Sequence, residues 1–228
     1  RDRSPSRGLG DVYKRQMFMN TFVIAIFTCI ISTIFVLSVA YSMSRMRFKM
    51  RKPFMNIAMI IGLFPSFMSM IAVYYILRAL NLADGAMIRV ALIIVFSAGS
   101  GAGFYVAKGF FDTISKSLDE AAIIDGATRW NVFTKITVPL SKPIIVYTIL
   151  TSFMGPWVDF IFGKVICRAD AQYYTVSIGL WKMLEKEYID SWYTCFAAGA
   201  VVVSIPIAIL FLMTQKFYVE GMTGAVKG

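Results

Sequence analysis

Five apolar runs, each near the length that crosses a lipid bilayer, constrain this chain more than any other feature. A helix rises about 1.5 Å per residue, so about 20 apolar residues cross a hydrocarbon core about 30 Å thick. The runs extend over residues 18–41, 55–77, 87–110, 144–166 and 193–213. The sequence therefore predicts an all-α integral membrane protein with five transmembrane helices.

The composition supports this prediction and excludes other classes. Hydrophobic residues make up 58% of the chain and charged residues 16%, and the mean hydropathy is +0.68. Such a profile is typical of multi-span membrane proteins rather than of soluble domains. The net charge of +10 could suggest nucleic acid, but the basic residues cluster in short loops beside the apolar runs. We therefore expect a lipid bilayer and no nucleic acid as the partner of this positive charge.

The cysteines do not indicate a metal site. Cys29, Cys167 and Cys195 lie far apart, and the chain contains no histidine. A usual Cys/His zinc site is therefore excluded. We interpret the three cysteines as small buried hydrophobic residues.

Lysine and arginine in short loops predict the orientation, because cytoplasmic loops carry an excess of them. Five basic residues between positions 45 and 52 place the first loop in the cytoplasm. The turn at 81–85 has none and faces outward, while 108–142 faces inward, 180–192 outward and the tail from 216 inward. The same alternation places the residues before Phe18 outside.

The first 16 residues differ from the rest. The segment RDRSPSRGLGDVYKRQ holds five of the 23 basic residues and no apolar run, and it does not have the pattern of a signal peptide. We interpret residues 1–16 as foreign to the natural protein. Residues 17–228 then form one transmembrane domain, with a cytoplasmic loop at about 112–143 and a tail at about 216–228.

The most informative polar stretch is EAAIIDGATRWNVFTKITVPLSKP, from Glu120 to Pro143, which we call the island. Small and acidic residues predict a short helix over 118–125, and Gly126 can end it with a positive φ. A second, amphipathic helix is expected over 127–138, with Pro139 ending it. Pro143 falls in the first turn of the next apolar run, where a missing N–H is tolerated.

The island resembles the EAA loop of the membrane-spanning permease subunits of bacterial binding-protein-dependent ABC importers. The matching residues have the family's spacing and are Glu120, Ala121, Ala122, Gly126, Ile136 and Pro139. Val138 departs from the leucine that the family usually has there, which exchanges one apolar residue for another. The resemblance extends from about 20 to 228. It is strongest to the sugar-permease branch that includes the maltose type, on the segments AYSMSRMRFKMRK (40–52), WVDF (157–160) and GMTGAVKG (221–228).

This resemblance implies a fold, a location and partners. Sugar permeases of the family have six helices, so we expect the chain to lack the first one. The resemblance implies a multi-pass protein of the bacterial cytoplasmic (inner) membrane. It also implies three kinds of partner: a second homologous permease subunit, two cytoplasmic ATPase subunits and an extracytoplasmic solute-binding protein.

The chain itself is expected to be non-catalytic. No G-x-x-x-x-G-K-[ST] phosphate loop occurs in it, so no cofactor is expected here, and the resemblance assigns ATP-Mg to the partner ATPase. The resemblance implies that Glu120 offers a carboxylate to that ATPase. It also implies that Ala121, Ala122 and Gly126 allow the two backbones to approach closely. Asp125 and Pro139 complete the expected coupling set, and ATP-driven motion is expected to pass through Pro139 and Pro143 into the next helix. In the tail, the resemblance implies ATPase contacts by Gly224 and Lys227.

The translocation pathway is less specific. Trp157, Asp159 and Phe160 are candidates, because an intramembrane carboxylate suggests function and an aromatic ring can stack on a sugar. They can equally mark a helix that approaches the outer interface, where aromatic residues concentrate. In the external segment, Tyr173, Tyr174 and Trp181 could contact the binding protein or lipid headgroups.

The expected cargo is a neutral carbohydrate, with another solute such as glycerol phosphate as the alternative within the family. A secondary transporter would need an internal inverted repeat and coupling carboxylates near the midplane, and neither is evident. A membrane-embedded enzyme would need converging catalytic groups, which this sequence does not supply.

Overall fold

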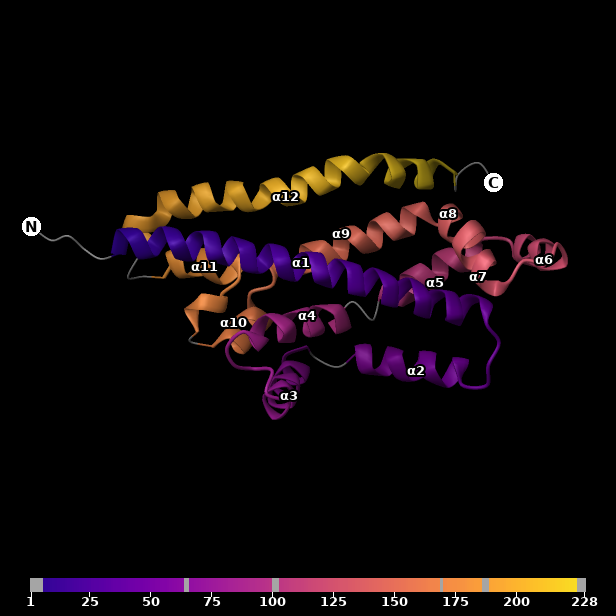
Figure 1. The fold of residues 1–228 in the computed structure, drawn as a ribbon, viewed down its shortest axis with the longest axis horizontal. Coiled ribbons are helices and arrows are strands. Elements are labelled where there is room, and N and C mark those ends of the chain that lie inside the picture. The colour runs from indigo at the N-terminus through magenta and orange to yellow at the C-terminus, as the bar shows by residue number, and fades with distance from the viewer. Residues whose placement is uncertain (1–5, 64–65, 100–102, 169, 186–188, 225–228) are drawn as a thin grey trace, which may run out of the picture. The chain divides into compact units, whose positions relative to one another are not determined.

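A computed structural model describes residues 6–63, 66–99, 103–168, 170–185 and 189–224, and side chains within most of these ranges. These residues form helices and connecting turns, as the apolar runs predict (Figure 1). The α-helices are α1 (Ser6–Arg45), α2 (Arg51–Gly62), α3 (Ser66–Ala79), α4 (Met87–Gly99), α5 (Gly103–Thr113), α6 (Lys116–Ile124), α7 (Arg129–Val132), α8 (Val138–Leu140), α9 (Lys142–Val158), α10 (Ile161–Cys167), α11 (Val176–Met183) and α12 (Ile189–Gly224). A π-helical segment η2 (Phe133–Thr137) and a 3₁₀ segment η3 (Ala171–Tyr173) complete the set.

Two described helices are individually long and apolar enough to cross a membrane. They are Arg15–Arg45 within α1 and Trp192–Phe217 within α12. Two bent pairs raise the number to four if each pair is one span, namely α4 with α5 and Arg129–Leu140 with α9. The predicted second run, 55–77, is instead divided between α2 and α3, and Pro65 between them lies outside the described residues.

The other interior prolines fit the expected helices. Pro156 lies within α9 and Pro206 within α12, as membrane helices permit. α1 begins at Ser6, so part of the segment 1–16 continues the first helix.

The chain divides into two compact units. Unit 1 comprises Arg1–Thr28, Pro65–Ser97 and Ser152–Leu210. Its core is a cluster of buried residues from α1, α3, α4, α10 and α11 and their connections, including Ile24, Leu92, Ile166 and Ile178. In this cluster Cys167 is 1% exposed, as predicted. Cys29 is only half-buried and Cys195 is exposed, so the prediction of a buried residue was wrong for Cys195.

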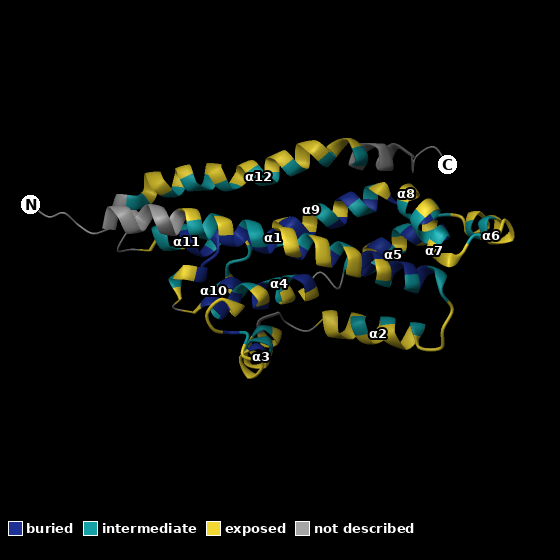
Figure 2. Cartoon of the chain, in the orientation of Figure 1, coloured by how far each residue is buried: buried dark blue, intermediate teal, exposed yellow. Residues whose placement is uncertain are grey.

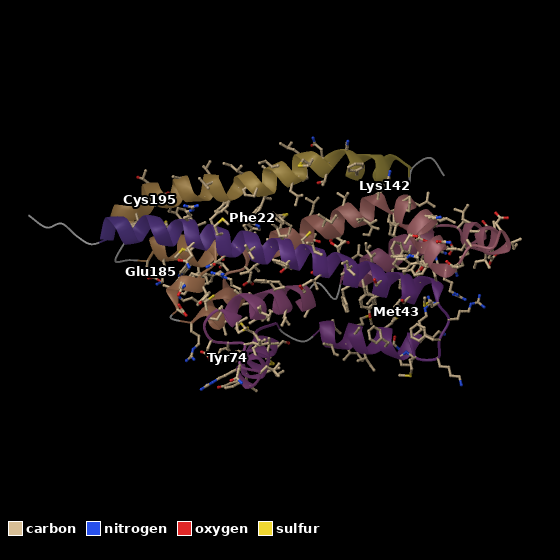
Figure 3. All side chains as sticks on the ribbon, viewed as in Figure 1. Phe22, Met43, Tyr74, Lys142, Glu185 and Cys195 are labelled. Carbon is tan, nitrogen blue, oxygen red and sulfur yellow. The ribbon has the colours of Figure 1, made fainter. Side chains whose placement is uncertain are left out.

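Unit 2 comprises Cys29–Phe64, Ala98–Thr151 and Phe211–Gly228. Its core joins the second half of α1 to α5 and the start of α9 through Val36, Ala40, Phe104, Phe111 and Ile144. Met43, labelled in Figure 3, belongs to the same cluster and is 6% exposed. This core supports the island, which lies wholly in unit 2.

Candidate coupling site

The first half of the island folds as its sequence predicts. Ser115 caps α6 by accepting a hydrogen bond from the N–H of Ser117. At the other end, Gly126 has φ +85°. The N–H of Gly126 donates to the carbonyl of Ile123, and the N–H of Ala127 donates to that of Ala122. These two bonds form a Schellman motif, which explains the four-residue spacing from Ala122 to Gly126.

The second half differs from the prediction at Pro139. We expected this proline to end the second helix, but the chain runs from α7 through η2 into α8, which ends at Leu140. Pro139 is the second residue of α8 and follows the π-helical segment η2. Ser141 then makes the turn into α9, and the segments on its two sides meet at 80°.

The coupling candidates lie on the outside of this structure. Glu120, Ala121, Asp125, Gly126 and Pro139 are exposed, and Ala122 is half-buried. Figure 2 shows α6 as mostly exposed. Large apolar side chains lie among them, with exposed fractions of 45% for Leu118, 50% for Ile123, 85% for Ile124 and 69% for Trp130.

The side of the island opposite its exposed face is fixed to the C-terminal end of α1. The Nε atom of Arg45 lies 3.2 Å from Oδ2 of Asp119 in α6, and the two side chains are 5% and 13% exposed. The Nη2 atom of Arg45 also donates to the carbonyls of Phe111 and Ile114, at 3.0 and 2.9 Å. One guanidinium therefore holds together α1, the end of α5 and α6.

A second contact joins α1 to α7 and η2. The rings of Tyr41 and Phe133 lie 4.7 Å apart, and the Tyr41 hydroxyl donates to the carbonyl of Arg129 at 3.5 Å. Phe133 is partly buried and Thr137 fully buried, whereas Trp130 is exposed. The buried side of this segment therefore includes Phe133 and Thr137 but not Trp130.

Sequence reasoning missed Arg45, Asp119 and Tyr41. From the sequence, Arg45 serves only to predict loop orientation, and Asp119 is one of the acidic residues that predict a helix over 118–125. The available signal was an acidic residue directly before the island, in a segment predicted to lie on the same side of the membrane as the strongly basic loop 45–52.

The structure places the three pathway candidates in unit 1, in different surroundings. The Trp157 side chain is 3% exposed, and its ring lies against Phe18 at 5.3 Å and Phe153 at 5.9 Å. Phe160 instead packs on Trp181, with 5.0 Å between ring centroids. The structure therefore does not bring the Trp157 and Phe160 rings to one open surface.

We predicted that Asp159 lies inside a spanning helix. The structure instead places it between two helices. α9 ends at Val158, and the Asp159 carboxylate accepts the N–H of Gly163 at 3.0 Å, in the first turn of α10. Aspartate competes for backbone N–H groups and therefore favours helix starts over helix interiors. In this structure Asp159 stabilises the break between α9 and α10.

The aromatic residues expected at the external surface are largely buried. Tyr173 and Tyr174 are 9% and 3% exposed, whereas Trp181 is 53% exposed. Arg89 lies over the Tyr173 ring at 5.4 Å, and Lys164 lies over the Tyr174 ring at 5.5 Å. The tyrosine prediction was wrong because cation–π contacts and core packing hold these rings inside unit 1.

The tail candidates cannot be placed in the site. Gly224 is the last residue of α12, and its surroundings are not described. Lys227 lies outside the described residues.

Comparisons with known proteins give the family of the chain. Residues 36–222 match the model of the family described as binding-protein-dependent transport system inner membrane component. The chain is 35% identical over 215 residues to the galactooligosaccharides transport system permease protein GanQ of Bacillus subtilis (strain 168), covering 93% of this chain and 74% of GanQ. It is 32% identical to the maltodextrin transport system permease protein MalD of Streptococcus pneumoniae (strain ATCC BAA-255 / R6), covering 92% and 74%.

A solved structure agrees with these relatives. It is a bacterial ABC transporter involved in the import of the acidic polysaccharide alginate. It matches with a TM-score of 0.75 and 26% identity, covering 93% of this chain and 78% of that one. The chain therefore belongs to the family of binding-protein-dependent transport system inner membrane components.

Proposed function

We propose that this inner-membrane chain is a permease subunit of an ATP-driven importer and forms part of the pathway for a carbohydrate that an external binding protein delivers. The observation that carries the proposal is the similarity, over more than nine-tenths of the chain, to permeases whose names specify galactooligosaccharides and maltodextrin. In this proposal a second homologous permease completes the pathway. Two cytoplasmic ATPase subunits use ATP-Mg, and this chain binds no cofactor.

The exposed face of the island is the proposed contact with an ATPase subunit. Ile124 and Trp130 are 85% and 69% exposed, and large exposed apolar side chains on a loop expected in the cytoplasm favour a protein partner. Glu120 adds a carboxylate that can accept hydrogen bonds from a cation of the partner. Asp125, beside the Gly126 corner, supplies a second exposed carboxylate.

Two attachments support transmission of ATPase motion into the membrane. The island continues through Ser141, which is fully buried, into α9. Arg45 and Tyr41 attach its inner side to α1. A displacement of the island therefore acts on α9 and on α1 together, whereas the sequence suggested only the route through Pro139 and Pro143.

The described cations in unit 1 favour a neutral cargo over a phosphorylated one. A phosphorylated solute would be bound by lysine or arginine facing the pathway. In the described part of unit 1, Arg89 and Lys164 instead lie over tyrosine rings. Hydroxyl hydrogen bonds and ring stacking would recognise a carbohydrate, with Trp157, Asp159 and Phe160 retained as pathway candidates.

ATPase stimulation in the reconstituted complex tests this function. The complex contains this chain, its partner permease, the ATPase and the binding protein. We expect the binding protein loaded with an oligosaccharide to stimulate ATP hydrolysis. Stimulation by glycerol phosphates or amino acids, with no response to any sugar-loaded binding protein, would reject the carbohydrate assignment.

A further inference from the structure

Unit 2 contains a polar cavity of about 510 Å³ that the coupling contact does not account for. Its wall is formed by the end of α1, the loop that enters α2, and the helices α6 and α7. The cations that line it are Arg45, Arg47, Arg51, Lys116 and Arg129, and the carboxylates are Asp119 and Glu120. The cavity therefore collects basic residues that are far apart in the sequence.

The positive charge of this cavity is only partly compensated. Arg45 and Asp119 form an ion pair. Among the described residues, none of the other four cations has a carboxylate within 4.0 Å. These four cations face the single remaining carboxylate, Glu120, which leaves a net excess of three positive charges.

Arg45 adds an unused donor in the same wall. Its side chain is only 5% exposed, and Nη1 is buried with no acceptor in the described part of the chain. Buried charged donors are normally hydrogen-bonded. Oδ1 of Asp119 is likewise buried with no donor in the described part of the chain, so the groups that an anion in the cavity would meet are the four cations without a carboxylate.

The surroundings of the cavity are apolar. Met46, Phe48 and Ile123 line it. Beside it, Met50 and Phe54 are 62% and 44% exposed at the start of α2. Cations next to exposed apolar side chains, at the end of a membrane-spanning helix, are typical of the boundary between headgroups and hydrocarbon.

We propose that this cavity binds the phosphate group of an anionic phospholipid of the cytoplasmic leaflet. The planar guanidinium groups of Arg47 and Arg51 match phosphate oxygens in pairs, while Phe48 and Phe54 contact the acyl chains. Basic pockets beside membrane helices on the cytoplasmic side bind anionic headgroups in this way. Because α6 forms one wall of the cavity, the bound lipid also contacts the island.

An acidic surface of the ATPase is the competing occupant, but it accounts for fewer of the observations. It would use the cations and would leave Phe48, Met50 and Phe54 exposed to water. A lipid satisfies both the charged wall and the apolar rim with one molecule.

Native mass spectrometry of the whole purified complex tests the proposal. The complex is equilibrated with phosphatidylglycerol or phosphatidylcholine, and retained lipid is counted in the wild type and in an Arg47→Gln/Arg51→Gln variant. The control, Lys49→Gln/Lys52→Gln, removes two exposed charges from the same loop but none from the cavity wall. We expect the cavity variant to bind phosphatidylglycerol about 25-fold more weakly, because each of the two basic residues near a membrane surface contributes about a fivefold factor, and we expect the control to be unchanged.

Four other outcomes would overturn the proposal. Equal losses in both variants would mean diffuse attraction to the positive loop. Unchanged retention in both would mean that the cavity holds no lipid. Displacement of the lipid by inorganic phosphate at equal concentration would mean that a free anion is the ligand. The cavity would be assigned to the ATPase if the cavity variant bound the ATPase more weakly in lipid-free detergent but retained phosphatidylglycerol as well as the wild type in the equilibrated samples.

Discussion

Arg45 and Asp119 are separated by 74 positions (119 − 45), yet they form an ion pair at 3.2 Å that attaches the island to the end of α1. With side chains 5% and 13% exposed, the pair is largely removed from solvent. Removal of one partner from a buried pair leaves a charge without compensation, which is strongly destabilising. The stability of unit 2 therefore depends on this contact more than on its exposed charges.

The first prediction concerns this pair. Asp119→Ala should lower the free energy of unfolding by about 3 kcal/mol, because the buried Arg45 guanidinium loses its counter-charge. Thermal unfolding of the purified complex in detergent measures the effect. The control is Asp84→Ala, which removes an exposed carboxylate outside the proposed ATPase contact and should change stability by less than about 0.5 kcal/mol. Equal effects of the two variants would show that the pair is not a main support of the island.

The second prediction concerns Glu120. Glu120→Lys should leave the protein inserted and folded, since the residue is exposed, but should lower uptake at least tenfold. A charge-assisted hydrogen bond contributes about 1.5–3 kcal/mol, and the introduced cation would also repel a basic partner. Uptake and pull-down of the ATPase measure the loss. Asp84→Lys is the control, because Asp84 lies in the exposed turn predicted to face outward. Wild-type uptake with Glu120→Lys would exclude Glu120 from the coupling contact.

The third prediction concerns the corner at Gly126. An added Cβ at this position meets no atom within 4 Å, so the constraint is the backbone φ of +85° rather than space. Gly126→Val should therefore disturb the corner and reduce ATPase binding, because β-branched residues resist positive φ. Gly126→Asn should retain most binding, because asparagine adopts this region more readily. If valine and asparagine behave alike in the pull-down, the conformation of the corner is not what the partner needs.

These residues also show how far sequence reasoning reaches. The Gly126 corner was predictable because a Schellman motif depends on a few consecutive residues. The contact between Arg45 and Asp119 was not, because it joins two helices distant in the chain, and either residue taken alone resembles an ordinary surface charge. Asp159 was misplaced for a related reason. Hydropathy is averaged over a whole apolar run, so it assigns Asp159 to the span. The Asp159 carboxylate instead accepts a local backbone hydrogen bond at the start of α10.

The fourth prediction concerns Cys167. Burial raises the pKa of this thiol to about 12, and only the thiolate reacts with maleimides. At pH 8 about one thiol in ten thousand is then ionised, and the labelling rate should rise about tenfold for each pH unit below 12. The measurement uses a variant with Cys29→Ala and Cys195→Ala, compared folded and denatured, where the thiol regains a pKa near 8.5. Rapid labelling of the folded protein at pH 8 would show that Cys167 is accessible.

The last prediction concerns orientation. The turn that contains Asn81 joins α3 to α4 and has no basic residue between positions 79 and 88, whereas five basic residues lie between positions 45 and 52. Because positive loops stay in the cytoplasm, a reporter inserted at Asn81 should be extracytoplasmic, and reporters at Lys49 and at the C-terminus should be cytoplasmic. Alkaline phosphatase, active only outside, and a fluorescent protein that folds only inside give opposite signals at each site. Placing the island on the ATPase side requires this result, since the residues from Lys108 to Lys142 must face the same compartment as Lys49. A cytoplasmic Asn81 would reverse the assignment of every loop and would exclude the island from contact with a cytoplasmic ATPase.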